Sequence, residues 1–599
     1  MIYHCEDHTC NYWDEGEKLP ERCPQCGRKL LRANEADMTG DDWTALGNTL
    51  WDAEASDKKR MVDCFRKAAY LGSAWGVCNL GICMEQGNGV EADPVQAFWL
   101  YQQAVEMGSL NAVCCLGVCY EYGIGTAPDA EKAAELYCKA AEYGSPRGQM
   151  LLAHAFHDGI GVEADAAEAV YWVRAAAYQR YGEGMHRLGV CYAYGDGVEQ
   201  NWEHAVHWFR EAAESGVSAA MTDLGYCYEK GCGVEQSWEQ AFSWYRRGAE
   251  CGYPVSMSNL GLCYKRGYGV EQNWQEAIKW YEQGAQCGDL QSMNNLAYCY
   301  ERGEGVEQNE DRALYWYRRS AEGGNGDAMC NLGRCYKRGY GVEQNWQEAV
   351  KWYEQGAQCG NLQSMHNLAC CYERGEGVEQ NMTEAIRWYT AAAEGGNTDD
   401  MYNLGWQYDH GEGVEQDMKK AICWYERAAE QNHPAAMNSL GECYAMGQGV
   451  PRDLETAMEW YRRAAELGEA MADYNMGWHL EQAGKLSEAY AHYRKAADGN
   501  DDSAWWALGR FYENGVVVAQ DGKEARRCYE TGEKLGSVKC KMRLARCRLL
   551  GIGGRREKKA GLDLCRQALE LAKESSEKED YGYEAEMNLL RRTIAENES

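Results

Sequence analysis

Four cysteines near the start of the chain have the residue type and spacing of a metal site. Cys5 and Cys10 form one pair, and Cys23 and Cys26 form a second pair about a dozen residues later. The second pair lies in a Cys-Pro-Gln-Cys-Gly knuckle. Two such pairs can close a tetrahedral zinc site. A segment of about 30 residues cannot bury enough core to fold alone, so a metal would supply its folding energy.

This segment resembles the rubredoxin-like zinc ribbons. The second knuckle matches their pattern, whereas the first pair has four intervening residues instead of two. His8 follows Cys5 at the usual two-residue gap and is an alternative ligand. The resemblance implies a structural Zn²⁺ site with the ligands Cys5, Cys10, Cys23 and Cys26. An iron electron-transfer site and unliganded thiols are the alternatives.

A second candidate site is a row of polar residues at fixed spacing. Asparagine recurs directly before a leucine or methionine, at the asparagine position, and a basic residue recurs seven residues later, at the basic position. Seven residues are nearly two helical turns, so both positions share one helix face. Asparagine can satisfy a peptide's donor and acceptor, and arginine can bind a carboxylate with two hydrogen bonds. The predicted partner-binding residues, named here the asparagine–arginine track, are Asn259, Asn295, Asn331, Asn367, Asn403, Lys230, Arg266, Arg302, Arg338 and Arg374.

The track also has a purely structural interpretation. Basic residues near a helix C-terminus interact favourably with the helix dipole, and the asparagine can be a feature of the repeat itself. Asn79 and Asn475 occupy the same position outside the track, and His410 extends the basic row. Both interpretations stay open at the level of sequence.

Other catalytic chemistry is sparse. The 12 histidines are scattered, and His154, His157, His186, His204 and His207 lack metal-site spacing. His204 and His207 lie three residues apart on one second helix and are expected to be surface residues. The Gly-x-Gly pairs are not phosphate loops, because no Gly-Lys-Ser/Thr follows and no strand precedes them. We therefore predict that the chain is not an enzyme.

A sequence repeat of 36 residues predicts the helices that position these residues. Leucine followed by a small residue recurs every 36 positions, for example at Leu80, Leu116, Leu152 and Leu188. A fixed period in this range is typical of a solenoid, in which each unit packs only on its neighbours.

Each unit has the signals of two helices. Met221, Leu224 and Cys227 lie on one helix face, and Gly231 and Gly233 end that helix. An Asp, Asn or Ser then precedes the second helix at the preferred N-cap position. The second helix carries tryptophan at Trp172, Trp208, Trp244, Trp280, Trp316, Trp352, Trp388, Trp424 and Trp460. An aromatic residue at this spacing is expected in the core.

The repeat also explains many of the 29 cysteines. Ten share one position, three residues after the leucine, where cysteine is expected to be a small buried hydrophobe. These are Cys83, Cys119, Cys191, Cys227, Cys263, Cys299, Cys335, Cys371, Cys443 and Cys547. Free thiols in such numbers favour a reducing cytoplasm.

The pattern Asn-Leu-Gly-x-x-Tyr-x-x-Gly-x-Gly-Val, then an N-cap residue and Ala-x-x-Trp-Tyr-x-x-Ala-Ala, resembles the Sel1-like repeats, a subgroup of tetratricopeptide-like repeats. The resemblance implies an all-α, right-handed superhelical solenoid of about 15 repeats whose groove binds other proteins. In related tetratricopeptide proteins the asparagine position lines that groove. Secreted cysteine-rich members place cysteines at two positions that here read Ala249 and Met257, which supports an intracellular location.

We expect four segments: a zinc ribbon over 1–32, a linker over 33–41, a solenoid over 42–555 and a C-terminal capping helical segment over 556–599. Irregular units are expected near 42–75, 470–500 and 536–555. Within the solenoid, residues 258–309 and 330–381 differ at only six of 52 positions, which indicates a tandem duplication.

Charge and hydropathy exclude two classes of partner. The formal charge of −32 argues against nucleic acid and anionic membranes. No apolar run approaches the roughly 18 residues that span a bilayer. The start of the chain has no basic segment followed by an apolar stretch, so no secretion signal is expected.

The leading functional hypothesis is a cytoplasmic scaffold that binds a protein or peptide on a solenoid groove, with a structural zinc ribbon at its N-terminus. The alternative is a metal-dependent redox carrier or regulator that acts through the four N-terminal cysteines.

Overall fold

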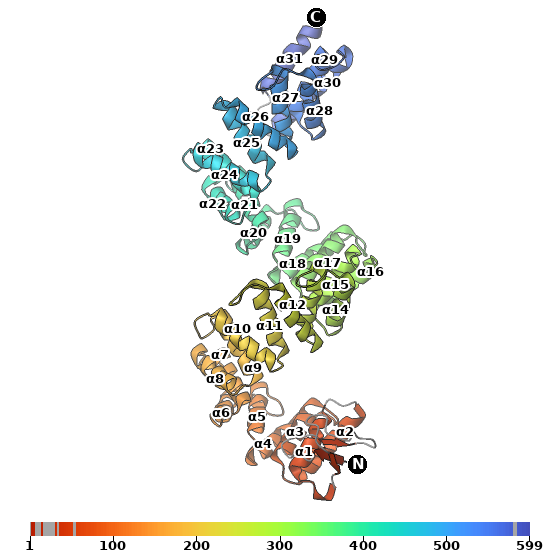
Figure 1. Cartoon of the computed structure of the whole chain (residues 1–599), viewed down its shortest axis with the longest axis vertical. Coiled ribbons are helices and arrows are strands. Elements are labelled where there is room, and N and C mark those ends of the chain that lie inside the picture. The colour runs from red at the N-terminus through yellow and green to blue at the C-terminus, as the bar shows by residue number, and fades with distance from the viewer. Residues whose placement is uncertain are drawn as a thin grey trace. The chain divides into compact units, whose positions relative to one another are not determined.

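The computed structural model describes residues 2–5, 13–15, 30–32, 35–51, 55–578 and 584–598. Within them lie three short strands, one 3-10 helix (Glu35–Asp37) and the α-helices α1 to α31. The chain divides into two compact units, Met1–Asn309 and Glu310–Ser599. Figure 1 labels most of these helices.

The strands form a small antiparallel sheet at the N-terminus. Strand β1 (Ile2–Cys5) is central and pairs with β2 (Trp13–Glu15) on one side and β3 (Leu30–Arg32) on the other. Tyr3 lies opposite Asp14 and Arg32. Of the predicted zinc ligands, only the backbone of Cys5 lies in this sheet. Cys10, Cys23, Cys26 and the alternative His8 lie outside the described residues, so the zinc site stays a prediction.

The helices have nearly uniform lengths. In the first unit they are α1 (Gly40–Thr49), α2 (Ala55–Tyr70), α3 (Ala74–Gln86), α4 (Pro94–Glu106), α5 (Leu110–Tyr122), α6 (Ala130–Glu142), α7 (Pro146–Asp158), α8 (Ala166–Tyr178), α9 (Gly182–Tyr194), α10 (Trp202–Glu214), α11 (Ser218–Lys230), α12 (Trp238–Glu250), α13 (Pro254–Arg266), α14 (Trp274–Gln286) and α15 (Leu290–Arg302). In the second unit they are α16 (Glu310–Glu322), α17 (Gly326–Arg338), α18 (Trp346–Gln358), α19 (Leu362–Arg374), α20 (Met382–Glu394), α21 (Thr398–His410), α22 (Met418–Glu430), α23 (Pro434–Met446), α24 (Leu454–Glu466), α25 (Ala470–Gln482), α26 (Leu486–Asp498), α27 (Asp502–Asn514), α28 (Gly522–Lys534), α29 (Val538–Leu550), α30 (Lys558–Lys578) and α31 (Glu584–Glu598).

Within each unit the helices pack as hairpins. We call the odd-numbered helices α3 to α29 the A helices and the even-numbered helices α4 to α30 the B helices. An A helix packs on the B helix that follows it, as α11 does on α12, and that B helix packs on the next A helix, α13. Every contact of this kind joins sequence neighbours, as expected for a solenoid.

Local signals set the helix ends as predicted. The Ser237 hydroxyl accepts a hydrogen bond from Gln240 N and caps α12, and Asn345 caps α18 in the same way through Glu348 N. The first glycine of each Gly-x-Gly pair ends the A helix in the left-handed conformation, with φ of 74° at Gly231. Glycine adopts this conformation without the steric cost of a Cβ atom.

The predicted burial of the ten cysteines is confirmed, because each is at most 2% exposed. The tryptophans differ from the prediction in degree. All nine are half-buried, and Trp388, Trp424 and Trp460, for example, pack against the edge of the core. The residue that follows each tryptophan is buried. Tyr245, Tyr281 and Tyr353, for example, are at most 1% exposed. The large indole covers the edge of the core, and the following residue fills it.

A recurring hydrogen bond satisfies the buried tyrosine hydroxyl. Tyr245 Oη donates to Glu229 Oε2 at 2.8 Å, and the same bond, 16 residues apart, joins Tyr101 to Glu85 and Tyr137 to Glu121. At Tyr281 the residue 16 positions earlier is Lys265, which cannot accept a hydrogen bond. The buried Tyr281 hydroxyl accordingly has no partner among the described residues.

This difference gives a matched pair of variants. Tyr245→Phe is expected to lower the free energy of unfolding by about 1.5–3 kcal/mol, because it removes a hydrogen bond to a carboxylate. Tyr281→Phe is expected to be neutral or stabilising, since it removes a buried hydroxyl without a partner. Urea unfolding of both variants measures the difference, and equal losses would contradict it.

The last helices close the second unit. Buried side chains of α29, α30 and α31 form one apolar cluster, which includes Leu549, Cys565, Ala568, Met587 and Leu590. None of the described helices is long and apolar enough to cross a membrane.

Candidate functional site

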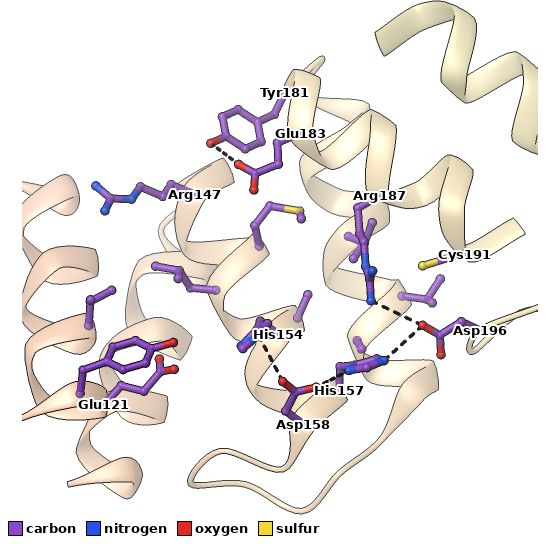
Figure 2. Close-up of a pocket in the computed structure, with 18 residues that line it drawn as sticks. Glu121, Arg147, His154, His157, Asp158, Tyr181, Glu183, Arg187, Cys191 and Asp196 are labelled. Atoms are coloured by element: carbon purple, nitrogen blue, oxygen red, sulfur yellow. Dashed lines mark hydrogen bonds and ion pairs between the residues drawn. The ribbon is translucent and has the colours of Figure 1, made fainter. Parts of the chain in front are cut away.

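A pocket of about 580 Å³ opens among the A helices α5, α7 and α9 and the B helix α8. Its apolar lining includes Val118, Met150, Leu151, Val170 and Val173. Figure 2 shows polar side chains around this lining. The pocket therefore combines an apolar lining with a polar edge, which is the usual composition of a ligand-binding site.

The polar edge is a chain of alternating basic and acidic side chains (Figure 2). Arg187 lies 3.6 Å from Asp196, and His157 Nε2 lies 3.4 Å from the same carboxylate. The other ring nitrogen of His157 contacts Asp158, whose second oxygen lies 3.2 Å from His154 Nε2. The hydrogen bond with His157 lowers the pKa of Asp158.

The opposite side of the pocket carries Arg147, Tyr181 and Glu183. Tyr181 Oη donates to Glu183 at 3.2 Å, and Arg147 Nη1 donates to Asn111 Oδ1 at 2.7 Å. Burial raises the pKa of the pocket's Cys191 thiol to about 11, so this thiol stays protonated at neutral pH. The arrangement supplies hydrogen-bond donors and acceptors around an apolar surface and suits binding. Among the described residues, no three His, Cys, Asp or Glu side chains converge on a possible metal position.

The helical repeat places these residues on one surface. In α7, Leu151 occupies the asparagine position, His154 lies three residues later and Asp158 occupies the basic position. All three line the pocket. We call the surface formed by these three positions on an A helix the A-helix face. The expectation that the asparagine and basic positions share one face is thus met in α7.

In the first unit the asparagines and the cations of the track differ in exposure. Asn259 and Asn295 are half-buried, whereas Lys230, Arg266 and Arg302 are exposed. Lys230 Nζ lies 2.8 Å from Glu229, and the Arg302 guanidinium lies 5.7 Å from the ring centroid of Tyr298.

In the second unit, Asn331, Asn367 and Asn403 are half-buried, and Arg338 and Arg374 are exposed. The structure thus places the cations of the track in solvent and the asparagines partly within the helix packing. Peptide binding by the track stays a prediction.

The asparagine position has a structural role that the sequence did not indicate. Asn367 Nδ2 donates to Cys330 Sγ at 3.4 Å, across two neighbouring A helices and 37 residues apart. The same 37-residue spacing joins Asn475 to Asn438 at 3.0 Å and Asp223 to His186 at 2.6 Å. A polar residue at this position therefore connects successive repeats, apart from any ligand.

The pocket itself was missed by sequence reasoning. His154 and His157 were described only as scattered histidines without metal-site spacing, and the structure joins them to Asp158 and Asp196. One signal was available, because His154 and Asp158 are four residues apart on the face that carries the track. The participation of Asp196, from the loop after α9, depends on the packing of neighbouring repeats.

The fold is a helical-repeat solenoid that carries a pocket among its A helices. The Sel1 repeat family model matches residues 76–109, 112–145, 146–181, 182–217, 218–253, 254–289, 290–325, 326–361, 362–397, 398–433, 434–469, 470–501, 504–537 and 538–573. The chain belongs to the Sel1 repeat family. These fourteen matches and the irregular α1–α2 hairpin agree with the predicted number of about 15 repeats.

Solved structures include similar proteins. A protective antigen present in uropathogenic Escherichia coli strains, which displays an SLR fold, is 33% identical over 75% of this chain and 97% of that chain, with a TM-score of 0.46. A Sel1 repeat protein from Oxalobacter formigenes is 32% identical over 41% of this chain and 96% of its own, with a TM-score of 0.36. Among curated proteins, none matches the chain.

Proposed function

We propose that this chain is a non-catalytic protein-interaction scaffold that binds an extended peptide on the A-helix face. The observation that carries the proposal is the pocket among α5, α7 and α9, which lies on that face. Its apolar lining suits one side chain of a peptide. Its polar edge and its arginines offer partners for the peptide backbone and for a carboxylate.

The exposed cations of α11, α13 and α15 favour an acidic partner for these repeats. Lys230, Arg266 and Arg302 are exposed at the basic positions of α11, α13 and α15. The chain as a whole carries a formal charge of −32. A local row of cations attracts an acidic segment to one position, and the negative charge of the rest of the chain repels that segment elsewhere.

A charge-reversal experiment tests this surface. Changing Lys230, Arg266 and Arg302 together to glutamate is expected to reduce capture of acidic partners by about tenfold or more. Partners are identified by affinity capture with the full chain from extracts of the native host, followed by mass spectrometry, and their affinities are then measured by titration.

The matched control changes three exposed cations of B helices, Lys132, Arg246 and Lys279, to glutamate. This control changes the net charge by the same amount as the test variant and leaves the A-helix face intact. Equal losses of binding in the two variants would mean that net charge, and not the A-helix face, attracts the partner.

We also propose a structural zinc ion at the N-terminus, on the basis of the cysteine spacing alone. Cys23→Ser/Cys26→Ser is expected to abolish bound zinc, measured by metal analysis of the purified full chain. Stoichiometric zinc in the wild type, with partner binding retained in the variant, would reject the alternative of a redox carrier. The free, buried thiols of the repeats support a reducing, cytoplasmic location.

A further inference from the structure

Cys370 lies in a side-chain cluster that the scaffold function does not use. It is on the A-helix face of α19, three residues after Asn367 and four before Arg374, and it is half-buried. Its Sγ lies 3.6 Å from His366 Nε2, and His366 Nδ1 lies 2.7 Å from Asp400 Oδ1 in α21. A thiol, an imidazole and a carboxylate are thus connected in a row, with the imidazole in the middle.

Asp400 is placed to orient the imidazole. Its side chain is fully buried in the first turn of α21, where the helix dipole favours a negative charge. Its Oδ2 has no hydrogen-bond partner among the described residues, so His366 is the side chain that balances the carboxylate. A carboxylate on one ring nitrogen leaves the other nitrogen directed at the sulfur.

The electrostatics agree with this geometry. The hydrogen bond to Asp400, and then the contact with Cys370, raise the pKa of His366 to about 10. Burial disfavours a thiolate at Cys370, but the hydrogen bond and the positive charge of His366 favour it, and the pKa of the thiol is lowered. Tyr389 Oη lies 3.3 Å from Cys370 Sγ. An imidazolium beside a thiolate is the arrangement that activates a cysteine.

The duplicated block shows that the repeat does not require this cluster. Two of the six differences between residues 258–309 and 330–381 fall on the cluster, because Asn294 stands in the place of His366 and Tyr298 in the place of Cys370. The residue that corresponds to Asp400 in the next repeat is Ala328. A nearly identical hairpin therefore folds with none of the three groups.

We propose that Cys370 is a nucleophilic thiolate that undergoes thiol–disulfide exchange with small disulfides that carry carboxylates. The thiolate attacks one sulfur of the disulfide, a new S–S bond forms to Cys370, and the original S–S bond breaks. The leaving thiolate departs into solvent with the electron pair of the broken bond, and the His366 imidazolium keeps its proton. The disulfide supplies the oxidising equivalents, and Arg374, one turn away on the same face, attracts its carboxylate.

Acyl transfer is a poorer fit for this cluster. Cys370 lies inside α19, so its backbone N–H is engaged in the helix and cannot stabilise an oxyanion. Tyr389 Oη donates to Glu373 at 3.0 Å and is committed to that carboxylate. Disulfide exchange needs no oxyanion site.

The test uses the full chain and the dicarboxylate disulfide 5,5′-dithiobis(2-nitrobenzoate) at about pH 6, where an ordinary thiol is almost entirely protonated. Peptide mass spectrometry follows labelling at each cysteine over time. We expect Cys370 to react at least about tenfold faster than the exposed Cys251, Cys287, Cys359 and Cys423. Labelling of Cys370 at or below their rate would overturn the proposal.

Two variants show whether Cys370 reacts quickly because His366 and Asp400 activate its thiol or because the thiol is exposed. His366→Asn and Asp400→Ala introduce the residues that the equivalent positions already carry, so both are expected to fold, which circular dichroism checks. Each is expected to slow labelling of Cys370 about tenfold or more at this pH. An unchanged rate in folded His366→Asn would show that exposure alone explains the reactivity and would also overturn the proposal.

Discussion

Replacing Glu513 by alanine is expected to lower the free energy of unfolding of the C-terminal repeats by about 3–5 kcal/mol. The Glu513 carboxylate is only 10% exposed and accepts hydrogen bonds from Tyr529 at 2.8 Å and Arg543 at 3.3 Å, and it also contacts Arg546. Arg543 in turn binds Glu586 of α31 at 2.7 Å. Removing one member of a buried charge network leaves its partners buried and uncompensated.

The matched control for this variant is Glu229→Ala. Glu229 accepts the equivalent hydrogen bond from Tyr245, but its only cationic neighbour in an ion pair among the described residues is the exposed Lys230. Its loss is expected to cost about 1–3 kcal/mol. Native-state hydrogen exchange of α29 and α31 in the first variant, and of α11 and α12 in the second, compares the two costs. Equal costs would mean that the arginines contribute nothing beyond the tyrosine hydrogen bond.

Gly161→Ala is expected to lower the free energy of unfolding by about 2–5 kcal/mol. The residue has a φ of +67°, and a Cβ atom there would lie 2.0 Å from the backbone oxygen of Ala130, the first residue of α6. The left-handed conformation costs roughly 1–2 kcal/mol with a side chain, and the overlap with a backbone atom adds to it. The loop can relieve this overlap only by moving away from the preceding repeat.

Gly159→Ala, in the same loop, separates the two costs. Gly159 has a φ of +72°, but a Cβ atom there would meet nothing closer than 3.6 Å. Its replacement is expected to cost only about 1–2 kcal/mol, the cost of the left-handed conformation. Thermal and urea unfolding of the two variants under identical conditions provide the comparison. A cost for Gly161→Ala no greater than that for Gly159→Ala would show that the contact with α6 relaxes freely.

The two glycines illustrate what a repeat sequence predicts and what it omits. The Gly-x-Gly pair of each unit was expected to end a helix, as at Gly231 and Gly233, and Gly159 does so as the C-cap of α7. Gly161 is needed for an additional reason, the close approach of its loop to α6. A helix end is a local event that neighbouring residues specify, whereas a close approach depends on how one hairpin packs on the previous one.

In the candidate sites, too, the sequence predicted local features and not the contacts between helices. Periodicity alone predicted that the asparagine and basic positions share a helix face, and α7 shows this with Leu151 and Asp158. Periodicity did not indicate that Asn367 hydrogen-bonds to Cys330, or that His366 and Asp400 meet. Those pairs are 37 and 34 residues apart, on different helices.

The sequence by itself determined the class of fold, the helix ends, the burial of ten cysteines and the family, because these depend on signals repeated every 36 residues. Only the tertiary structure decided which side chains form the pocket, which tyrosine hydroxyls lack a partner and which of the many cysteines stands beside an imidazole and a carboxylate. The physical reason is one of range. Helix formation and capping act over a few residues along the chain, whereas hydrogen bonds between neighbouring repeats require two helices to be packed at a definite distance and rotation.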